Sequence, residues 1–381
     1  MKRNQNLKKI VCALTLMSLA LVFTNCSKED AAEFEGEAHA FSACIDDGTG
    51  SCDEDIILFD PTDPTDPGSG GTSTPPSLSS RFRYYHRGNS GDNIFTSSSS
   101  SGRGNWSGSV NTNGNNRLDD QSISATQFGN RVAVVHQGRT SNTIFYSFSR
   151  DGRNFTRDRS IPTGARTSGT IKTVEFNGRL FVYHHNGSSN RIYYNSTSNG
   201  TNWVGNRPIS DANSYLAFDV VVLGNRLFLV SLTNSSISVS SSTDGINFSR
   251  VTRDGLGLNV APRNIDVVAV DDIIYILFED RRISSRTRNL SIGKWINGSN
   301  PIGFVSFVSI GTTTDQPATI ASDGTTLVVA YENDNGNGIT VSYNTAFRNI
   351  PRNQTIPPSS WRRVAGSGRT SLSGVSLIYT E

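Results

Sequence analysis

The stretch that decides the fold is STDGINF at residues 242–248, a short polar turn that ends in an aromatic residue. The chain repeats this turn as SRDGRNF at residues 149–155 and, with Asn in place of Asp, as TSNGTNW at residues 197–203. Asp and Asn side chains accept hydrogen bonds from nearby turn amides, and Gly takes the positive φ that such a turn requires. The recurrence predicts a repeated structural unit.

Strand-like runs accompany each copy of the turn. Residues 126–138, 174–187 and 221–234 each contain an apolar or alternating run, a Gly-Asn or Asn-Gly pair, and a second run rich in Val, Leu and aromatics, which is typical of a hairpin. The Arg after the tight turn falls at Arg131, Arg179 and Arg226, at intervals of 48 and 47 residues. A third strand-like run follows each hairpin. This period, with several short strands per unit, is typical of β-propeller blades.

The two ends of the repeated region complete one unit between them. Residues 82–106 read as the second and third strands of a unit that lacks its first strand, and residues 370–381 read as a lone first strand. We therefore expect an all-β, six-bladed β-propeller over residues 81–381, in which the C-terminal strand closes the first blade. No helical periodicity competes with this prediction.

The repeated turn is similar to the Asp-box, or BNR repeat, of sialidases and related propellers, over about 300 residues. Residues 99–106 and 291–295 look like degenerate copies. The resemblance implies a structural turn on the face opposite the ligand site, in which the aromatic residue packs between sheets. The residues it assigns to these turns are Asp151, Gly152, Phe155, Asn199, Gly200, Trp203, Asp244, Gly245 and Phe248.

The same resemblance implies an alternative function, a sialidase-type glycoside hydrolase. A sialidase uses an arginine triad for the substrate carboxylate, a Tyr nucleophile with a Glu partner, and an Asp acid/base. The Arg-Ile-Pro signature of sialidases is absent, because RNIP at residues 348–351 carries an intervening Asn and lies near the wrong end. The catalytic candidates are Arg166, Arg263, Arg369, Tyr215, Glu279 and Asp280.

Polar and aromatic residues recur at the ends of the expected second strands. They suit repeated small glycan sites, because rings stack on sugars and His, Asn or Glu bind hydroxyls. The strands at residues 82–86 and 181–185 also resemble those of six-bladed fucose-type lectins. The alternative is that these His residues cap strands in solvated loops of copied blades. The ligand-binding candidates are Tyr85, His86, His136, His184, His185 and Glu332.

We therefore expect a propeller that binds glycans or host glycoconjugates. A propeller that binds a protein partner in an envelope complex is a further alternative. The formal net charge of +2 gives no general reason to expect a nucleic acid partner. The sequence also predicts no cofactor, no metal site and a monomer.

The N-terminal region resembles that of a bacterial lipoprotein. A basic segment precedes the apolar residues 10–23, which are too few to span a bilayer comfortably, and Cys26 follows. We expect a signal peptide at residues 1–25 and a lipidated Cys26, and the alternative is an ordinary signal peptide. Ser27 and the acidic residues after it resemble signals for the outer membrane and the cell surface. Residues 26–80 read as a flexible tether rich in Pro, Gly, Ser and Thr, in which Cys44 and Cys52 are able to form a disulfide.

Overall fold

The computed structural model describes residues 78–88, 93–112, 118–138, 141–167, 169–186, 191–210, 216–233, 236–255, 264–280, 288–297, 303–314, 317–332, 338–366 and 375–381. The predicted signal peptide, Cys26, Cys44, Cys52 and most of the tether lie outside these ranges. In the part of the chain described, no helix is both long and apolar enough to cross a membrane.

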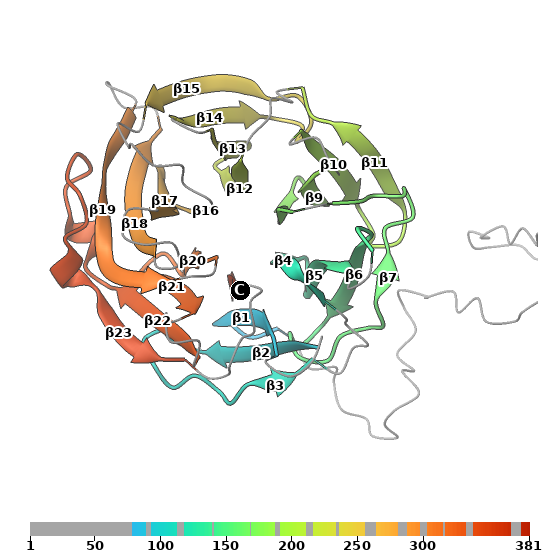
Figure 1. Ribbon diagram of the computed structural model, residues 1–381, viewed down its shortest axis with the longest axis horizontal. Coiled ribbons are helices and arrows are strands. Elements are labelled where there is room, and N and C mark those ends of the chain that lie inside the picture. Colours follow the sequence, from blue (N-terminus) through green and yellow to red (C-terminus); the bar gives the residue numbers. More distant parts are fainter. Residues whose placement is uncertain are drawn as a thin grey trace, which may run out of the picture. The chain divides into compact units, whose positions relative to one another are not determined.

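Six four-stranded antiparallel sheets form a ring around a central axis (Figure 1). Blade 1 consists of β24 (Val375–Thr380), β1 (Arg81–Arg87), β2 (Ile94–Ser99) and β3 (Val110–Asn111). Blade 2 consists of β4 (Leu118–Phe128), β5 (Arg131–Gly138), β6 (Ile144–Ser149) and β7 (Arg159–Ser160). Blade 3 consists of β8 (Ile171–Phe176), β9 (Arg179–His185), β10 (Ile192–Thr197) and β11 (Trp203–Pro208).

Blade 4 consists of β12 (Ala217–Leu223), β13 (Arg226–Leu232), β14 (Ser236–Ser242) and β15 (Ser249–Gly255). Blade 5 consists of β16 (Ile265–Val270), β17 (Ile273–Asp280), β18 (Arg288–Ile296) and β19 (Gly303–Thr314). Blade 6 consists of β20 (Thr319–Ser322), β21 (Leu327–Glu332), β22 (Ile339–Asn344) and β23 (Arg362–Ala365), with the short 3-10 helices η1 (Phe347–Asn349) and η2 (Pro358–Ser360) before β23. The six-bladed, all-β prediction is therefore confirmed.

The predicted closure of the ring is also confirmed. The last strand, β24, pairs with β1 in an antiparallel register from Arg81 opposite Thr380 to His86 opposite Val375. It occupies the innermost place of blade 1, which β4, β8, β12, β16 and β20 occupy in the other blades. Residues from the two ends of the propeller region thus complete one sheet.

Tight turns join the first and second strands of the blades. Gly129 and Gly224 have φ of 56° and 62°, and Asp271 takes the same left-handed conformation in blade 5. The second strands pack on both faces, because each blade lies between two others. Val132 and Val134 contact the core shared with blade 1, whereas Ala133 and Val135 contact the core shared with blade 3.

The recurrent Asp-Gly turns lie between the third and fourth strands of their blades. Asp244 Oδ1 accepts hydrogen bonds from the backbone N–H of Ile246 and Asn247 at 2.8 and 2.7 Å, and Asp151 does the same in blade 2. Gly245 has a φ of 77°, and its carbonyl accepts a hydrogen bond from the Tyr183 hydroxyl of blade 3 at 2.6 Å. These turns therefore join neighbouring blades.

Two weaker copies of the turn have different outcomes. Within residues 99–106, Gly102 has a φ of 68° and donates to Ser99 Oγ at 3.1 Å, so a turn of this kind forms. Residues 291–295 lie inside the strand β18, so the turn expected there is absent.

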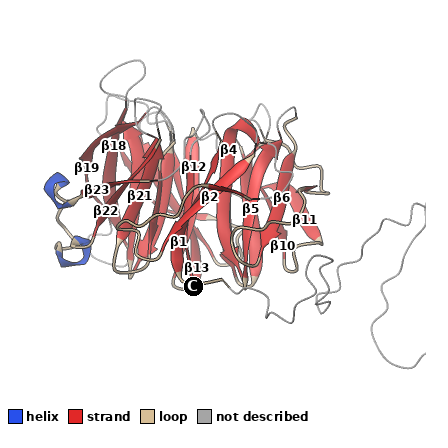
Figure 2. Ribbon diagram, turned by 90° about the horizontal axis from the view of Figure 1, so that it is seen from below, coloured by secondary structure: helices blue, strands red, loops and turns tan. Residues whose placement is uncertain are grey.

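The register of the strands defines two faces of the propeller, which is seen from the side in Figure 2. The lower face holds the tight turns and the Asp-Gly turns. The upper face holds the connections between second and third strands, beside the start of each first strand. The repeated turns are thus on the face opposite the ends of the second strands, as expected.

Candidate functional site

A cavity of about 870 Å³ lies on the propeller axis, among the innermost strands of all six blades. In Figure 1 these strands surround the centre of the ring. Polar side chains supply much of the cavity wall, including hydroxyls from Ser124 and Thr319 and the charged groups of Lys172, Asp219 and Asp266.

Six of these wall residues form what we call the polar ring, with one residue from each blade at the same level. Each pairs with an equivalent residue of its second strand, near the upper end of the blade. The members of the polar ring are Ser376, Ser124, Lys172, Asp219, Asp266 and Thr319, in the order of blades 1 to 6.

Four members of the polar ring hold the next blade by the same hydrogen bond. Ser124 Oγ accepts from the backbone N–H of Thr173 in blade 3 at 3.0 Å. The other three bonds join Val267 to Asp219, Leu377 to Thr319 and Ala125 to Ser376, at 2.8, 3.1 and 2.9 Å. In each case the donor is the residue directly after the polar-ring member of the next blade. Joining neighbouring blades is therefore a sufficient role for Ser124, Thr319 and Ser376.

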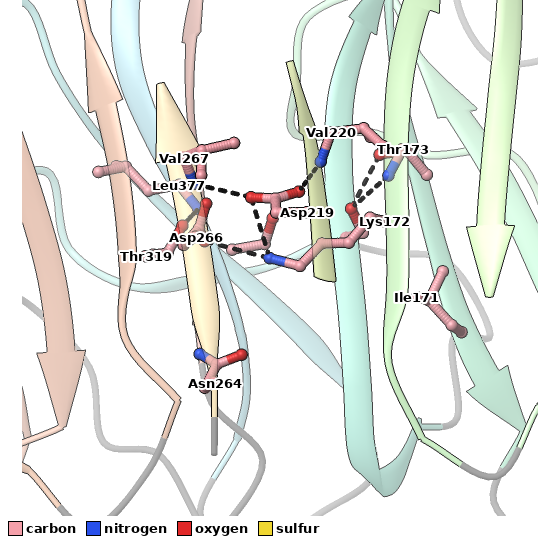
Figure 3. A network of polar contacts seen from close by, with 12 residues as sticks. Ile171, Lys172, Thr173, Asp219, Val220, Asn264, Asp266, Val267, Thr319 and Leu377 are labelled. Atoms are coloured by element: carbon pink, nitrogen blue, oxygen red, sulfur yellow. Dashed lines mark hydrogen bonds and ion pairs between the residues drawn. The ribbon is translucent and has the colours of Figure 1, made fainter. Parts of the chain in front are cut away.

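Lysine cannot accept a hydrogen bond, and the joint between blades 3 and 4 differs accordingly. By the same pattern, the backbone N–H of Val220 would donate to the side chain of Lys172. It instead donates to Asp219 Oδ1 at 2.7 Å. Lys172 Nζ contacts Asp219 Oδ2 at 3.3 Å and Asp266 Oδ2 at 3.4 Å (Figure 3). Blades 3, 4 and 5 therefore contribute a charged arc, Lys172, Asp219 and Asp266, to the polar ring.

The members of the charged arc are mostly buried. Burial and their mutual contacts shift the pKa values of Lys172 and Asp219. Burial alone lowers the pKa of Lys172, but the two carboxylates outweigh burial and raise it above its usual value. Burial raises the pKa of the Asp219 carboxyl well above its usual value, and Asp266 adds to this rise while Lys172 opposes it. The folded protein thus binds protons at Lys172 and Asp219 more tightly than the unfolded chain does.

Sequence reasoning did not select the charged arc, although a signal was present. Asp219 and Asp266 interrupt the runs AFDVVVL and IDVVAV, which are otherwise apolar. Lys172 is one of only two lysines after residue 80. A charged side chain inside an apolar innermost strand faces the axis or a neighbouring blade, and burying it is unfavourable unless it has a partner.

The six ligand-binding candidates are all buried in the structure, with at most 6% of each residue exposed. His136 Nε2 contacts Asp158 Oδ2 at 2.9 Å, and His86 Nε2 contacts Ser109 Oγ at 2.9 Å. Tyr85 donates its hydroxyl proton to the Gly152 carbonyl. In this conformation Tyr85, His86 and His136 connect parts of the blades.

The register separates these candidates into two sets. His86, His136 and His184 pair with the aromatic residues Phe95, Phe145 and Tyr193. The other set, His185 and Glu332, lies one residue further along the second strand and pairs with aliphatic residues, as does the catalytic candidate Glu279. Tyr85 belongs to neither set, because it lies one residue before His86 and pairs with Thr96. Successive residues point to opposite sides of a strand, so the two sets lie in different gaps between blades.

Burial lowers the pKa of His86, His184 and His185 to about 4. These three imidazoles are therefore neutral in the folded protein near neutral pH. Among the described residues, no group of three or more His, Cys, Asp or Glu side chains is placed to hold a metal ion.

The catalytic candidates are only partly described. Arg166 is exposed between β7 and β8, and its backbone forms an isolated bridge with Thr143. Glu279 is buried in β17, and Asp280 ends the same strand. Arg263, Arg369 and Tyr215 lie outside the described residues. Only one of the three arginines of the predicted triad, Arg166, is therefore among the described residues.

Comparison with known proteins supports the fold. A family model described as the DUF6242 beta propeller domain matches residues 158–260. No curated protein matches the chain. A mutant of the Aleuria aurantia lectin in complex with Fucα1-6GlcNAc is 12% identical, with a TM-score of 0.50 over 77% of this chain and 96% of the lectin. A glycosyl hydrolase from Bacteroides ovatus is 10% identical, with a TM-score of 0.44 over 61% of this chain and 85% of that protein. At 12% identity the similarity to the lectin concerns the fold alone.

Proposed function

We propose that this protein is a glycan-binding propeller whose ligand enters the axial cavity and contacts the charged arc. The observation that carries the proposal is the composition of the polar ring. Hydroxyl side chains suffice to join blades 1, 2 and 6 to their neighbours, whereas blades 3, 4 and 5 place ionisable groups at the same level.

Burying charge is unfavourable for folding, so a charged arc where hydroxyls would suffice is better explained by a ligand. Carboxylate, ammonium and amide groups are suited to sugar hydroxyls, because they accept and donate several hydrogen bonds at once. Asn264 adds an amide to the cavity wall next to Asp266. The cavity volume of about 870 Å³ lies in the range of known small-ligand sites.

The test is binding of the full chain to a glycan array, followed by calorimetry with the best glycan. Asp266→Asn keeps the shape of the side chain and removes its charge, and we expect it to weaken binding by about tenfold or more. Asp323→Asn is the matched control, because Asp323 lies in the tight turn of blade 6 on the lower face and bonds only turn groups.

The location is refuted if Asp266→Asn binds the glycan as tightly as the unmodified chain. Loss of binding in His136→Gln or His184→Gln, with Asp266→Asn unaffected, would instead place the ligand at the ends of the second strands. No binding to any glycan on the array would argue for a protein partner.

One observation favours a hydrolase as the second candidate. Asp219, with its raised pKa, and Asp266 are two carboxyls that face the same cavity, as a general acid and a second carboxylate do in glycosidases. Lys172 contacts both carboxyls, which argues against free access of either to a substrate. Release of sialic acid from a fluorogenic sialoside, with loss of that activity in Asp219→Asn, would support the hydrolase.

We also propose that Cys26 is lipidated and anchors the protein at the outer membrane, exposed at the cell surface. The basic and apolar residues before Cys26 support this part of the proposal. Labelling cells with a radioactive fatty acid tests it. The unmodified chain should carry the label and sediment with membranes, and Cys26→Ser should do neither.

A further inference from the structure

Arginine dominates the charge of the propeller region. Residues 81–381 contain 28 Arg and two Lys side chains against 20 Asp and Glu, so this region is distinctly basic although the whole chain has a net charge of only +2. A guanidinium group binds carboxylate or sulfate through two parallel N–H donors, which a lysine ammonium cannot do. The preference for Arg therefore indicates oxyanion binding beyond simple solubility.

Many of these arginines lie on the outermost strands of the ring. We call them the arginine rim, and their side chains are exposed. Arg159 and Arg207 occupy equivalent places, because they pair with Tyr146 in blade 2 and Tyr194 in blade 3. In Figure 1 the strands β7, β11, β15 and β23, which carry or adjoin the rim, form the outside of the ring. The members of the rim are Arg157, Arg159, Arg207, Arg250, Arg362 and Arg363.

Acidic side chains on the described surface have other partners. Asp151 and Asp244 bind the amides of their own turns, while Asp271 pairs with Arg348 at 2.7 Å. Within the described residues, no carboxylate pairs with Arg157, Arg207 or Arg362 of the rim. These guanidinium groups are therefore accessible to an anion from solution.

We propose that the arginine rim binds an acidic polysaccharide, one that carries sulfate or carboxylate groups. The rim extends over four blades, so a polymer with repeated anionic groups engages several arginines at once, whereas a small anion reaches only one or two. The large apolar side chains exposed in the described part of the chain are Val204, Leu216 and Val251, with no aromatic ring among them. Single-stranded nucleic acid sites stack bases on exposed aromatics, and none is among these side chains. Val204 and Val251 lie on β11 and β15 as single short side chains, which do not make the broad apolar face that a membrane-binding surface inserts.

This inference does not rest on the glycan site in the axial cavity. The charged arc combines two carboxyls with one ammonium inside the cavity, whereas the arginine rim offers only guanidinium groups on the outside of the ring. The rim is therefore a separate site, and the two sites can be tested with different ligands and different variants.

The experiment measures binding of the full chain to heparin and to polygalacturonate, with neutral dextran as the negative control. We expect binding to both acidic polymers, weakening as salt is added, because exposed charge pairs are screened. Arg157→Gln combined with Arg207→Gln should weaken binding by about fivefold or more. The matched control is Arg153→Gln combined with Arg226→Gln, which removes the same charge from exposed positions at turns of the lower face, off the rim, and should change binding by less than about twofold.

Three results would overturn the inference. The first is no binding of the unmodified chain to either acidic polymer at physiological salt. The second is equal weakening in the rim and control variants, which would mean that net charge alone is responsible. The third is tighter binding to single-stranded DNA or to anionic lipid vesicles than to heparin at the same salt concentration, which would assign the rim to a different partner.

Discussion

Replacing Lys172 with methionine tests the charged arc as a source of both stability and pH dependence. Lys172→Met keeps a long apolar stem but leaves Asp219 and Asp266, whose side chains are 8% and 14% exposed, without their cation. Removing one partner of a buried ion pair lowers the free energy of unfolding by about 3–5 kcal/mol. We expect about 3 kcal/mol, the lower end, because the cavity gives the arc some contact with water.

The loss should depend on pH in a defined direction. The pKa of Asp219 is already raised in the folded protein and Lys172 opposes that rise, so without Lys172 this carboxyl should bind its proton still more tightly in the folded than in the unfolded chain. Stability then falls as pH rises above the unfolded carboxyl pKa, so the deficit of the variant should shrink as pH is lowered. Taking the difference from the unmodified chain at each pH removes contributions from other groups.

The assay is urea unfolding followed by tryptophan fluorescence at about pH 7 and about pH 5. Lys172→Met combined with Asp219→Asn and Asp266→Asn serves as the rescue variant, because it leaves no unpaired charge, and it should regain most of the lost stability at pH 7. The reasoning is refuted if Lys172→Met loses less than about 1 kcal/mol, or if its deficit is the same at both pH values.

Three further predictions concern the blades. Asp244→Ala removes the acceptor of two turn amides and should lower the free energy of unfolding by about 1–3 kcal/mol without changing glycan affinity, measured by urea unfolding and calorimetry; a loss of affinity alone would contradict a structural role. Ser376→Ala leaves the buried N–H of Ala125 without its acceptor and should lower the free energy of unfolding by about 1–3 kcal/mol, whereas the exposed Ser141→Ala should change it by less than about 0.5 kcal/mol. His86, His184 and His185 have folded pKa values of about 4 and an unfolded value of 6.5, so unfolding takes up protons between these limits and stability should fall as pH drops from 6.5 towards 4. Each of these residues contributes up to about 1.4 kcal/mol per pH unit to the free energy of unfolding. The pH dependence of this free energy, measured by urea unfolding, should be weaker in His184→Gln, and an unchanged pH dependence would contradict the contribution of His184.

The fold was predictable because its signals are local and repeated. The turn at residues 242–248 requires Asp and Gly at set places, and the Gly-Asn pairs mark the tight turns, so both are visible in the sequence. The site was not predictable in the same way. His136 and His184 stand out by residue type, but their position within the second strand buries them between blades. Lys172, Asp219 and Asp266 come from three separate strands, and only the register of the ring brings them together.

The closing strand also gives the propeller a defined order of assembly. Both Ser376 and Leu377 of β24 take part in joints of the polar ring, with Ala125 and with Thr319 respectively. Blades 2 to 6 are each built from neighbouring segments, whereas blade 1 requires residues about 300 positions apart and therefore forms last during synthesis. Arg81 lies opposite Thr380, where the other blades have a tight turn. A circular permutant that joins Thr380 to Arg81 by a short turn would make the pairing of β24 with β1 a local hairpin, and the ring should then close faster.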